Sequence, residues 1–199
     1  GSGRRVALTG PSGSGKSSIV RLLLRFWEYQ GGRISVGQSD LRACDPEELR
    51  NVIGVVSQDT QLRNATIRDN LSMAAPGADE TAIRDALRIV QLKDFVEGLE
   101  EGLDTWVGEG GVRLSVGQAR RLVIAMVVLR KSPILILDEP TEGLDATTGH
   151  HLLKALTAYM TGRTVLIITH NPEQVLDLVD EVIRLENGRV VKSLSTTFT

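Results

Sequence analysis

Residues 10–17 read Gly-Pro-Ser-Gly-Ser-Gly-Lys-Ser and match the pattern G-x-x-x-x-G-K-[ST] in full. The apolar run 6–9 precedes this stretch as a short buried strand. A helix follows it, with apolar residues from Ile19 to Phe26 at i, i+3, i+4 and i+7. Glycines let a backbone wrap closely around phosphate oxygens, and the N–H groups of a helix start face the anion. The stretch therefore predicts a phosphate-binding loop rather than an ordinary glycine-rich turn.

The phosphate loop supplies most of the predicted nucleotide contacts. They are Gly10, Ser12, Gly13, Ser14, Gly15, Lys16, Ser17 and Ser18. We expect the Lys16 ammonium to contact the β- and γ-phosphates and the Ser17 hydroxyl to coordinate Mg²⁺. The predicted ligands are therefore ATP and Mg²⁺.

A second motif is an apolar strand that ends in two carboxylates. Residues 134–137 read Ile-Leu-Ile-Leu and are followed by Asp138 and Glu139. An aspartate at the end of such a strand, beside a phosphate loop, is placed to hold Mg²⁺. A glutamate one residue later can orient or deprotonate the attacking water. Many strands end in acidic residues for solvation alone, so the pair is informative only together with the loop. Both motifs predict a P-loop nucleotide hydrolase.

The order of the expected elements predicts the fold class. Strand and helix patterns alternate at both ends of the chain, while the middle is mostly helical. We therefore expect an α/β P-loop NTPase (RecA-like) core with a mostly parallel sheet and an inserted α-helical subdomain. The predicted single domain, 1–199, divides into a core lobe, 1–60 and 131–199, and a helical subdomain, 61–130.

Composition excludes several classes of protein. The chain has 199 residues, 41% of them hydrophobic, and a net charge of −2, which is an ordinary globular balance without the positive excess of a nucleic-acid binder. The single cysteine, Cys44, cannot form an internal disulfide. The longest apolar run, 122–129, is far shorter than the roughly 20 residues of a membrane-spanning helix, and the first residues show no signal peptide. Any membrane part is therefore expected outside this sequence.

Residues 114–118, Leu-Ser-Val-Gly-Gln, narrow the class of hydrolase. They resemble the signature motif of ABC transporter ATPases, usually Leu-Ser-Gly-Gly-Gln, and they open a long predicted helix as in that family. Other elements occur in the order that is usual for the family. Gln58, before the signature, matches the Q-loop glutamine. After the signature, Asp138 matches the Walker B aspartate, Glu139 matches the catalytic glutamate, residues 143–145 match the end of the D-loop, and His170 matches the switch histidine. The resemblance covers nearly the whole chain.

The resemblance implies roles for these residues. The catalytic residues would be Glu139, His170 and Lys16. The Mg²⁺ ligands would be Ser17, Gln58 and Asp138. The further nucleotide contacts would be Gln58, Ser115, Gly117 and Gln118. Ser115 is a good helix cap, and the helix start would form a second anion site. In the family, two such domains pair head to tail, and each ATP lies between one chain's phosphate loop and the other's signature. His150 and His151 match no motif and are expected on a solvated helix face.

Two segments resemble ABC exporters in particular. Residues 105–111 resemble the loop before the signature in exporters, and residues 66–71 resemble the exporter segment after the Q-loop. In that family, both segments contact the membrane domains. Residues 106–111 and 138–148 are also similar to the C-type subunit of the bacterial heterodimeric thiol (cysteine/glutathione) exporters linked to cytochrome bd assembly. The resemblance implies a motor domain at the cytoplasmic face of the bacterial inner (plasma) membrane, with a transmembrane domain and a second ATPase domain as partners and no nucleic acid.

Three alternatives stay open. They are a soluble ABC-type ATPase that acts on DNA or ribosomes, the ATPase subunit of another ABC transporter, and a nucleotide-sensing domain with little catalysis.

The sequence also departs from the family pattern. Val116 replaces a signature glycine, and its methyl groups are expected to crowd the phosphate of the site that this signature completes. The site built on this chain's own phosphate loop looks intact, so the asymmetry suits a heterodimer. Glu142 stands where the D-loop often has serine. Only nine residues precede Gly10, so we expect a domain that is truncated N-terminally and lacks the family's adenine-stacking aromatic residue.

Overall fold

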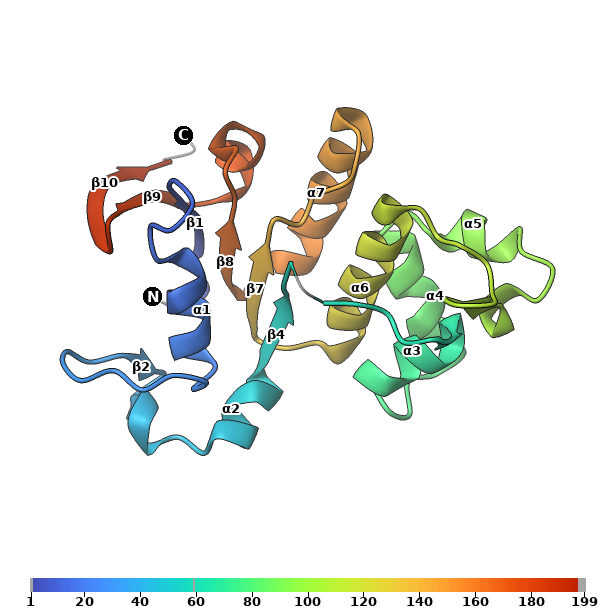
Figure 1. Cartoon of the computed structure of the whole chain (residues 1–199), viewed down its shortest axis with the longest axis horizontal. Coiled ribbons are helices and arrows are strands. Elements are labelled where there is room, and N and C mark those ends of the chain that lie inside the picture. The colour runs from blue at the N-terminus through green and yellow to red at the C-terminus, as the bar shows by residue number, and fades with distance from the viewer. Residues whose placement is uncertain (1, 59, 197–199) are drawn as a thin grey trace. The chain divides into compact units, whose positions relative to one another are not determined.

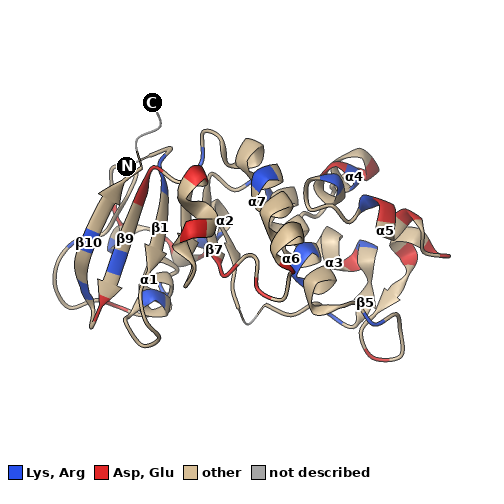
Figure 2. Cartoon of the chain, turned by 90° about the horizontal axis from the view of Figure 1, so that it is seen from above, with Lys and Arg blue, Asp and Glu red and all other residues tan. Residues whose placement is uncertain are grey.

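The computed structural model describes residues 2–58 and 60–196 (Figure 1). The chain falls into two compact units. The core unit comprises Gly1–Val55, Ser132–Glu139 and Met160–Thr199, and the helical unit comprises Val56–Lys131 and Pro140–Tyr159. Residues 140–159, which the sequence assigns to the core lobe, thus group with the helical unit. Acidic and basic residues are interspersed along the elements of both units (Figure 2).

A six-stranded sheet forms the centre of the core unit, in the order β10-β9-β1-β8-β7-β4. Its strands are β1 (Arg5–Thr9), β4 (Ile53–Val56), β7 (Ile134–Asp138), β8 (Thr164–Ile168), β9 (Glu181–Glu186) and β10 (Arg189–Ser195). β1 runs parallel to β8 and β9, β7 runs parallel to β8, and β10 closes an antiparallel hairpin with β9. The central strands are apolar runs, as in a sheet that is covered on both faces. The predicted mostly parallel α/β sheet is confirmed.

Short helices complete the core unit. They are α1 (Lys16–Leu23), α2 (Pro46–Val52), and the 3₁₀ helices Leu41–Ala43 and Pro172–Leu178; a small hairpin joins β2 (Ser35–Val36) to β3 (Ser39–Asp40). α1 packs on the sheet through Val20, and Leu24 just beyond its end joins the same buried cluster. Asp45 caps α2 by accepting hydrogen bonds from the N–H groups of Glu47 and Glu48.

The helical unit is organised around α6. It contains α3 (Ile67–Ala74), α4 (Glu80–Ile89), α5 (Lys93–Glu97), α6 (Val116–Arg130), most of α7 (Ala146–Met160), the 3₁₀ helix Gly102–Asp104, and β5 (Ala65–Thr66) paired with β6 (Trp106–Val107). α6 contacts α3 and α4, and most of its residues from Leu122 to Leu129 are buried, since the helix is apolar on nearly all sides.

α7 begins directly after Asp145. Asp145 accepts a hydrogen bond from the Thr148 N–H at 3.0 Å, and the hydroxyl and N–H of Thr148 hold the pKa of this carboxyl below its usual value. His150 and His151 are both exposed on this helix, as predicted. Among the described residues, no helix is both long enough and apolar enough to cross a membrane.

Candidate active site

Three neighbouring strands of the core unit end at the same edge of the sheet. In the parallel register, Leu8 of β1 and Asp138 of β7 both lie opposite Ile168 of β8. The phosphate loop, Glu139 and His170 follow the ends of these strands in the sequence, so all three lie at this edge. In open α/β sheets, ligands bind outside the carboxyl ends of the strands. The topology therefore brings together the core-unit motifs that the sequence identified.

The glycines of the phosphate loop are required by its geometry. Gly10, Gly13 and Gly15 have φ values of +147°, +77° and +107°. A Cβ atom on Gly10 would lie 2.1 Å from the Leu185 carbonyl oxygen, whereas one on Gly13 would meet nothing within 4 Å. The loop therefore packs closely against β9 at one end and keeps an open backbone surface farther along.

Lys16 closes the loop from the first position of α1. Its Nζ donates hydrogen bonds to the carbonyl oxygens of Gly10 at 2.8 Å and Pro11 at 2.9 Å. Gly15, at the N-cap, makes no side-chain cap, and the first turn of α1 holds no acidic residue. The helix start thus offers backbone donors and a cation without a competing carboxylate, which fits a phosphate group.

Glu139 and His170 form a hydrogen-bonded pair. Glu139 Oε1 accepts from the His170 backbone N–H at 2.8 Å and lies 2.9 Å from its Nδ1. The Glu139 side chain is 13% exposed, whereas that of His170 is 79% exposed. The Glu139 N–H donates to the Ile168 carbonyl at 2.9 Å. One carboxylate oxygen is thus held by His170, in an arrangement suited to orienting or deprotonating a water.

Asp138 and Ser17 supply the predicted metal donors of the core unit. Asp138 is the half-buried last residue of β7, and Ser17 is exposed at the second position of α1. Carboxylate and hydroxyl oxygens are the hard donors that Mg²⁺ prefers. The donor chemistry therefore fits Mg²⁺.

The remaining predicted site residues, Gln58, Ser115, Gly117 and Gln118, belong to the helical unit and are described within it. Ser115 caps α6 in a capping box: its Oγ accepts from the Gln118 N–H at 3.1 Å, and its own N–H donates to Gln118 Oε1 at 2.8 Å. A Cβ atom on Gly117 would lie 2.6 Å from Leu144 Cδ2, so packing also requires a glycine there. Val116, which lies between Ser115 and Gly117 in the sequence, is 71% exposed.

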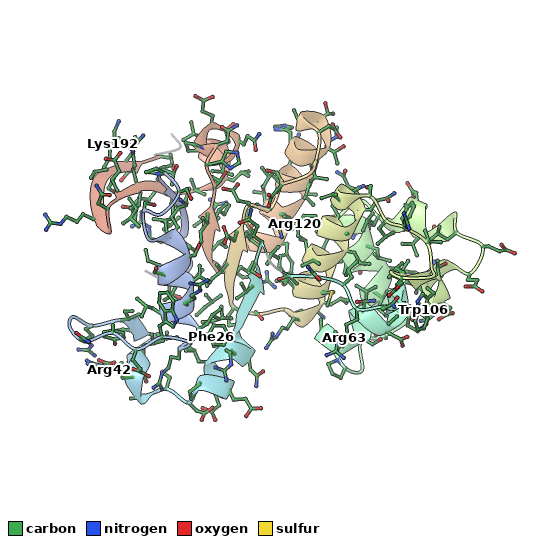
Figure 3. All side chains as sticks on the ribbon, viewed as in Figure 1. Phe26, Arg42, Arg63, Trp106, Arg120 and Lys192 are labelled. Atoms are coloured by element: carbon green, nitrogen blue, oxygen red, sulfur yellow. The ribbon has the colours of Figure 1, made fainter. Side chains whose placement is uncertain are left out.

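Two contacts of the helical unit were not predicted from the sequence. Gln58 Nε2 donates to Glu142 Oε1 at 3.1 Å, and Arg120 Nη1 donates to the Ser57 carbonyl at 2.7 Å. Arg120 is only 8% exposed on α6 (labelled in Figure 3). The sequence signal for the Arg120–Ser57 contact was an arginine among the apolar positions of a buried helix. The sequence signal for the Gln58–Glu142 contact was the departure of Glu142 from the family pattern.

An apolar groove of 620 Å³ lies in the helical unit. Its lining includes Leu62, Val107, Leu114 and Val116, together with Gln58 and Glu142. Trp106, labelled in Figure 3, is 46% exposed next to this lining and donates from its indole N–H to Asn64 Oδ1 at 3.0 Å. The groove is thus formed partly by the exporter-like segment 105–111.

Comparisons with known proteins agree with this arrangement. The sequence profile described as ABC transporter matches residues 1–142. The chain is 40% identical over 190 residues to the glutathione/L-cysteine transport system ATP-binding/permease protein CydC of Escherichia coli (strain K12), covering 96% of this chain and 33% of that protein. It is 43% identical over 191 residues to the ATP-dependent lipid A-core flippase of Sodalis glossinidius (strain morsitans), with the same coverage.

A solved structure shows the same fold. A bacterial Atm1-family ABC exporter with ATP bound matches with a TM-score of 0.92 and 37% identity, over 98% of this chain and 34% of that one. The chain thus spans about a third of the length of the relatives that it matches. The phosphate loop, the carboxylates at the strand ends and the capped signature helix, together with these matches, place the chain in the ABC transporter family, as its ATP-binding domain.

Proposed function

We propose that the chain is the ATP-hydrolysing motor domain of an ABC exporter, which couples ATP binding and hydrolysis to transmembrane export. The observation that carries this proposal is the Glu139–His170 pair at the strand ends that also bear the phosphate loop. A nucleotide-sensing domain without catalysis would not need a carboxylate held in this way.

Each group has a defined part in the proposed reaction. Lys16 and the N–H groups of the phosphate loop hold the phosphates and neutralise charge. Glu139 orients or deprotonates the attacking water, and His170 holds one of its carboxylate oxygens in place. Ser17, Asp138 and Gln58 would hold Mg²⁺, which supplies charge neutralisation at the β- and γ-phosphates.

The signature residues serve a partner chain in this proposal. Ser115, Gly117 and Gln118 shape the start of α6, where the first N–H groups of a helix can contact an anion. A second ABC ATPase domain in a head-to-tail dimer would bring its own phosphate loop to this helix start. A partner whose signature carries the usual glycine would make the two composite sites unequal, because Val116 completes only one of them. We therefore propose a heterodimer.

The second proposed partner is a transmembrane domain. The apolar groove lined by Val107 and Leu114, beside the exposed Trp106, supports docking of a membrane domain on the segment 105–111. The domain would then lie at the cytoplasmic face of the bacterial inner membrane. Similarity to CydC makes cysteine and glutathione the proposed substrates, and similarity to the lipid A-core flippase makes lipid the rival substrate.

The test uses the assembled transporter in inverted membrane vesicles. The wild type should hydrolyse ATP and accumulate labelled glutathione or cysteine. Glu139→Gln should keep ATP binding but lower both activities by about 100-fold or more, because the water loses its base. Glu47→Gln, at an exposed position of α2, is the matched control. Near-normal turnover in Glu139→Gln would refute the assigned role, and hydrolysis coupled to lipid movement alone would refute thiol export.

A further inference from the structure

We infer that Glu142 is a positioning residue that orients the side-chain amide of Gln58. The two residues are 84 positions apart in the sequence, and the Gln58 Nε2 donates to Glu142 Oε1 at 3.1 Å. Both lie in the helical unit and line the same groove. The inference rests on the proposed function, because it takes Gln58 to be a ligand of Mg²⁺.

The chemistry of the two side chains makes this contact directional. An ionised carboxylate only accepts hydrogen bonds, whereas a carboxamide has a donating NH₂ end and an accepting oxygen end. Gln58 must therefore turn its NH₂ group toward Glu142 and its oxygen away from it. Oxygen is the atom that Mg²⁺ takes from a glutamine. Glu142 thus selects the amide orientation in which the metal-binding atom stays available.

The backbone around Gln58 is held in place by the same unit. The Ser57 carbonyl accepts from the largely buried Arg120 of α6 at 2.7 Å and from the Thr60 N–H at 3.2 Å. The hydroxyls of Ser57 and Thr60 also hydrogen-bond at 2.8 Å. Hydrogen bonds on both sides of Gln58 therefore limit where its side chain can reach.

The turn that carries Glu142 is packed against the start of the same helix. The Leu144 N–H donates to the Thr141 carbonyl at 3.1 Å, and Gly143 has a φ of +76°. A Cβ atom on Gly143 would lie 2.5 Å from Val116 Cγ1, and Leu144 Cδ2 fills the space beside Gly117. No larger residue fits at 143 without movement. α6 therefore supports both partners: through Arg120 on the Gln58 side, and through its first residues on the Glu142 side.

The primary test measures the binding of Mn²⁺, as a spectroscopic substitute for Mg²⁺, to the assembled transporter with ATP, and also its ATP hydrolysis against Mg²⁺ concentration at fixed ATP. Glu142→Gln keeps the size of the side chain, but its amide can present either oxygen or nitrogen to Gln58, so the orientation is no longer selected. We expect the Mn²⁺ dissociation constant and the Mg²⁺ concentration for half-maximal activity to rise about fivefold, the effect of one hydrogen bond of average strength, with little change in kcat at saturating Mg²⁺.

A reversed pair provides a rescue. Gln58→Glu alone places two carboxylates against each other and should weaken Mg²⁺ use. Combined with Glu142→Gln, it restores one donor and one acceptor with their positions exchanged, and leaves a carboxylate oxygen at position 58 for the metal. We expect the double variant to need no more Mg²⁺ than the wild type. Glu101→Gln, at an exposed glutamate of the same unit, is the charge-matched control and should leave the titration unchanged.

The outcomes separate the inference from the proposed function. An unchanged Mg²⁺ requirement in Glu142→Gln overturns the inference, and so does a loss of kcat without a shift in that requirement, which is the behaviour of a merely structural contact. Failure of the reversed pair to recover also overturns it. A wild type that hydrolyses no ATP with Mg²⁺ overturns the proposed function as well.

Discussion

Glu139 has a left-handed backbone, with a φ of +48°, although it carries a Cβ atom. A conformation of this kind costs on the order of 1–3 kcal/mol and persists only where the surroundings enforce it. Here the N–H of Glu139 donates to Ile168, and its carboxylate accepts from His170. The turn after β7 therefore holds the side chain against the end of β8, and the energetic cost supports the role proposed for Glu139.

The Glu139–His170 pair gives a prediction for a single side chain. His170→Ala removes the Nδ1 contact but keeps the backbone N–H that holds Glu139. We expect kcat for ATP to fall by roughly 100-fold, in the range of general acid–base effects, with little change in KM. Steady-state ATPase kinetics would measure this, with His151→Ala on the exposed face of α7 as control. A kcat within a few-fold of the wild type would contradict a catalytic part for the imidazole.

Among the elements, α6 combines a buried body with a start to which we assign a role in the proposed function. Its residues from Leu122 to Leu129 form much of the core of the helical unit, whereas its first residues, Val116 and Gly117, contact the turn at 143–144. A buried helix is a stable support for the contacts made at its start. The capping box at Ser115 and Gln118 sets where the helix begins, and hence where its first N–H groups lie.

Removal of this cap should destabilise the helical unit. Ser115→Ala deletes the acceptor for the Gln118 N–H, and we expect the free energy of unfolding to fall by about 1 kcal/mol, the usual effect of losing an N-cap. Urea unfolding without nucleotide would measure this loss apart from any effect on ATP binding. Ser115→Thr keeps a capping hydroxyl and should stay close to the wild type. Equal stability of Ser115→Ala and the wild type would show that the capping box is not required.

At the scale of the whole molecule, the chain carries two helix starts suited to anions. α1, in the core unit, begins at Lys16, and α6, in the helical unit, begins at Val116. The start of α1 has no side-chain cap, whereas the start of α6 is capped by Ser115 and carries the exposed Val116. In the proposed dimer, each ATP contacts the start of α1 from one chain and the start of the signature helix from the other chain. Val116 therefore affects only the site that is completed by this chain's signature.

This asymmetry can be measured in the assembled dimer. Val116→Gly removes the two methyl groups expected to crowd the phosphate, and turnover should rise several-fold, about fivefold for each kcal/mol of crowding that is relieved. Val116→Ala should give an intermediate rate. ATPase assays on the purified dimer would test both variants. Unchanged turnover would show that the valine does not inhibit.

The sequence by itself determined the phosphate loop, the acidic strand end, the capped start of α6 and the mostly parallel sheet. These features follow from neighbouring residues: glycines permit positive φ values, a serine caps the helix it precedes, and apolar runs become buried strands. The type of the 3₁₀ helix Pro172–Leu178 is not determined in this way, because a few apolar residues at helical spacing do not distinguish a 3₁₀ helix from an α-helix.

Only the tertiary structure decided which side chains meet. Glu139 contacts His170 because β7 and β8 are parallel neighbours in register. Glu142 contacts Gln58 across 84 residues because both segments are supported by α6, and Gly143 must lack a side chain because Val116 lies beside it. Such contacts depend on how distant elements pack, and no local pattern of residue types encodes that packing.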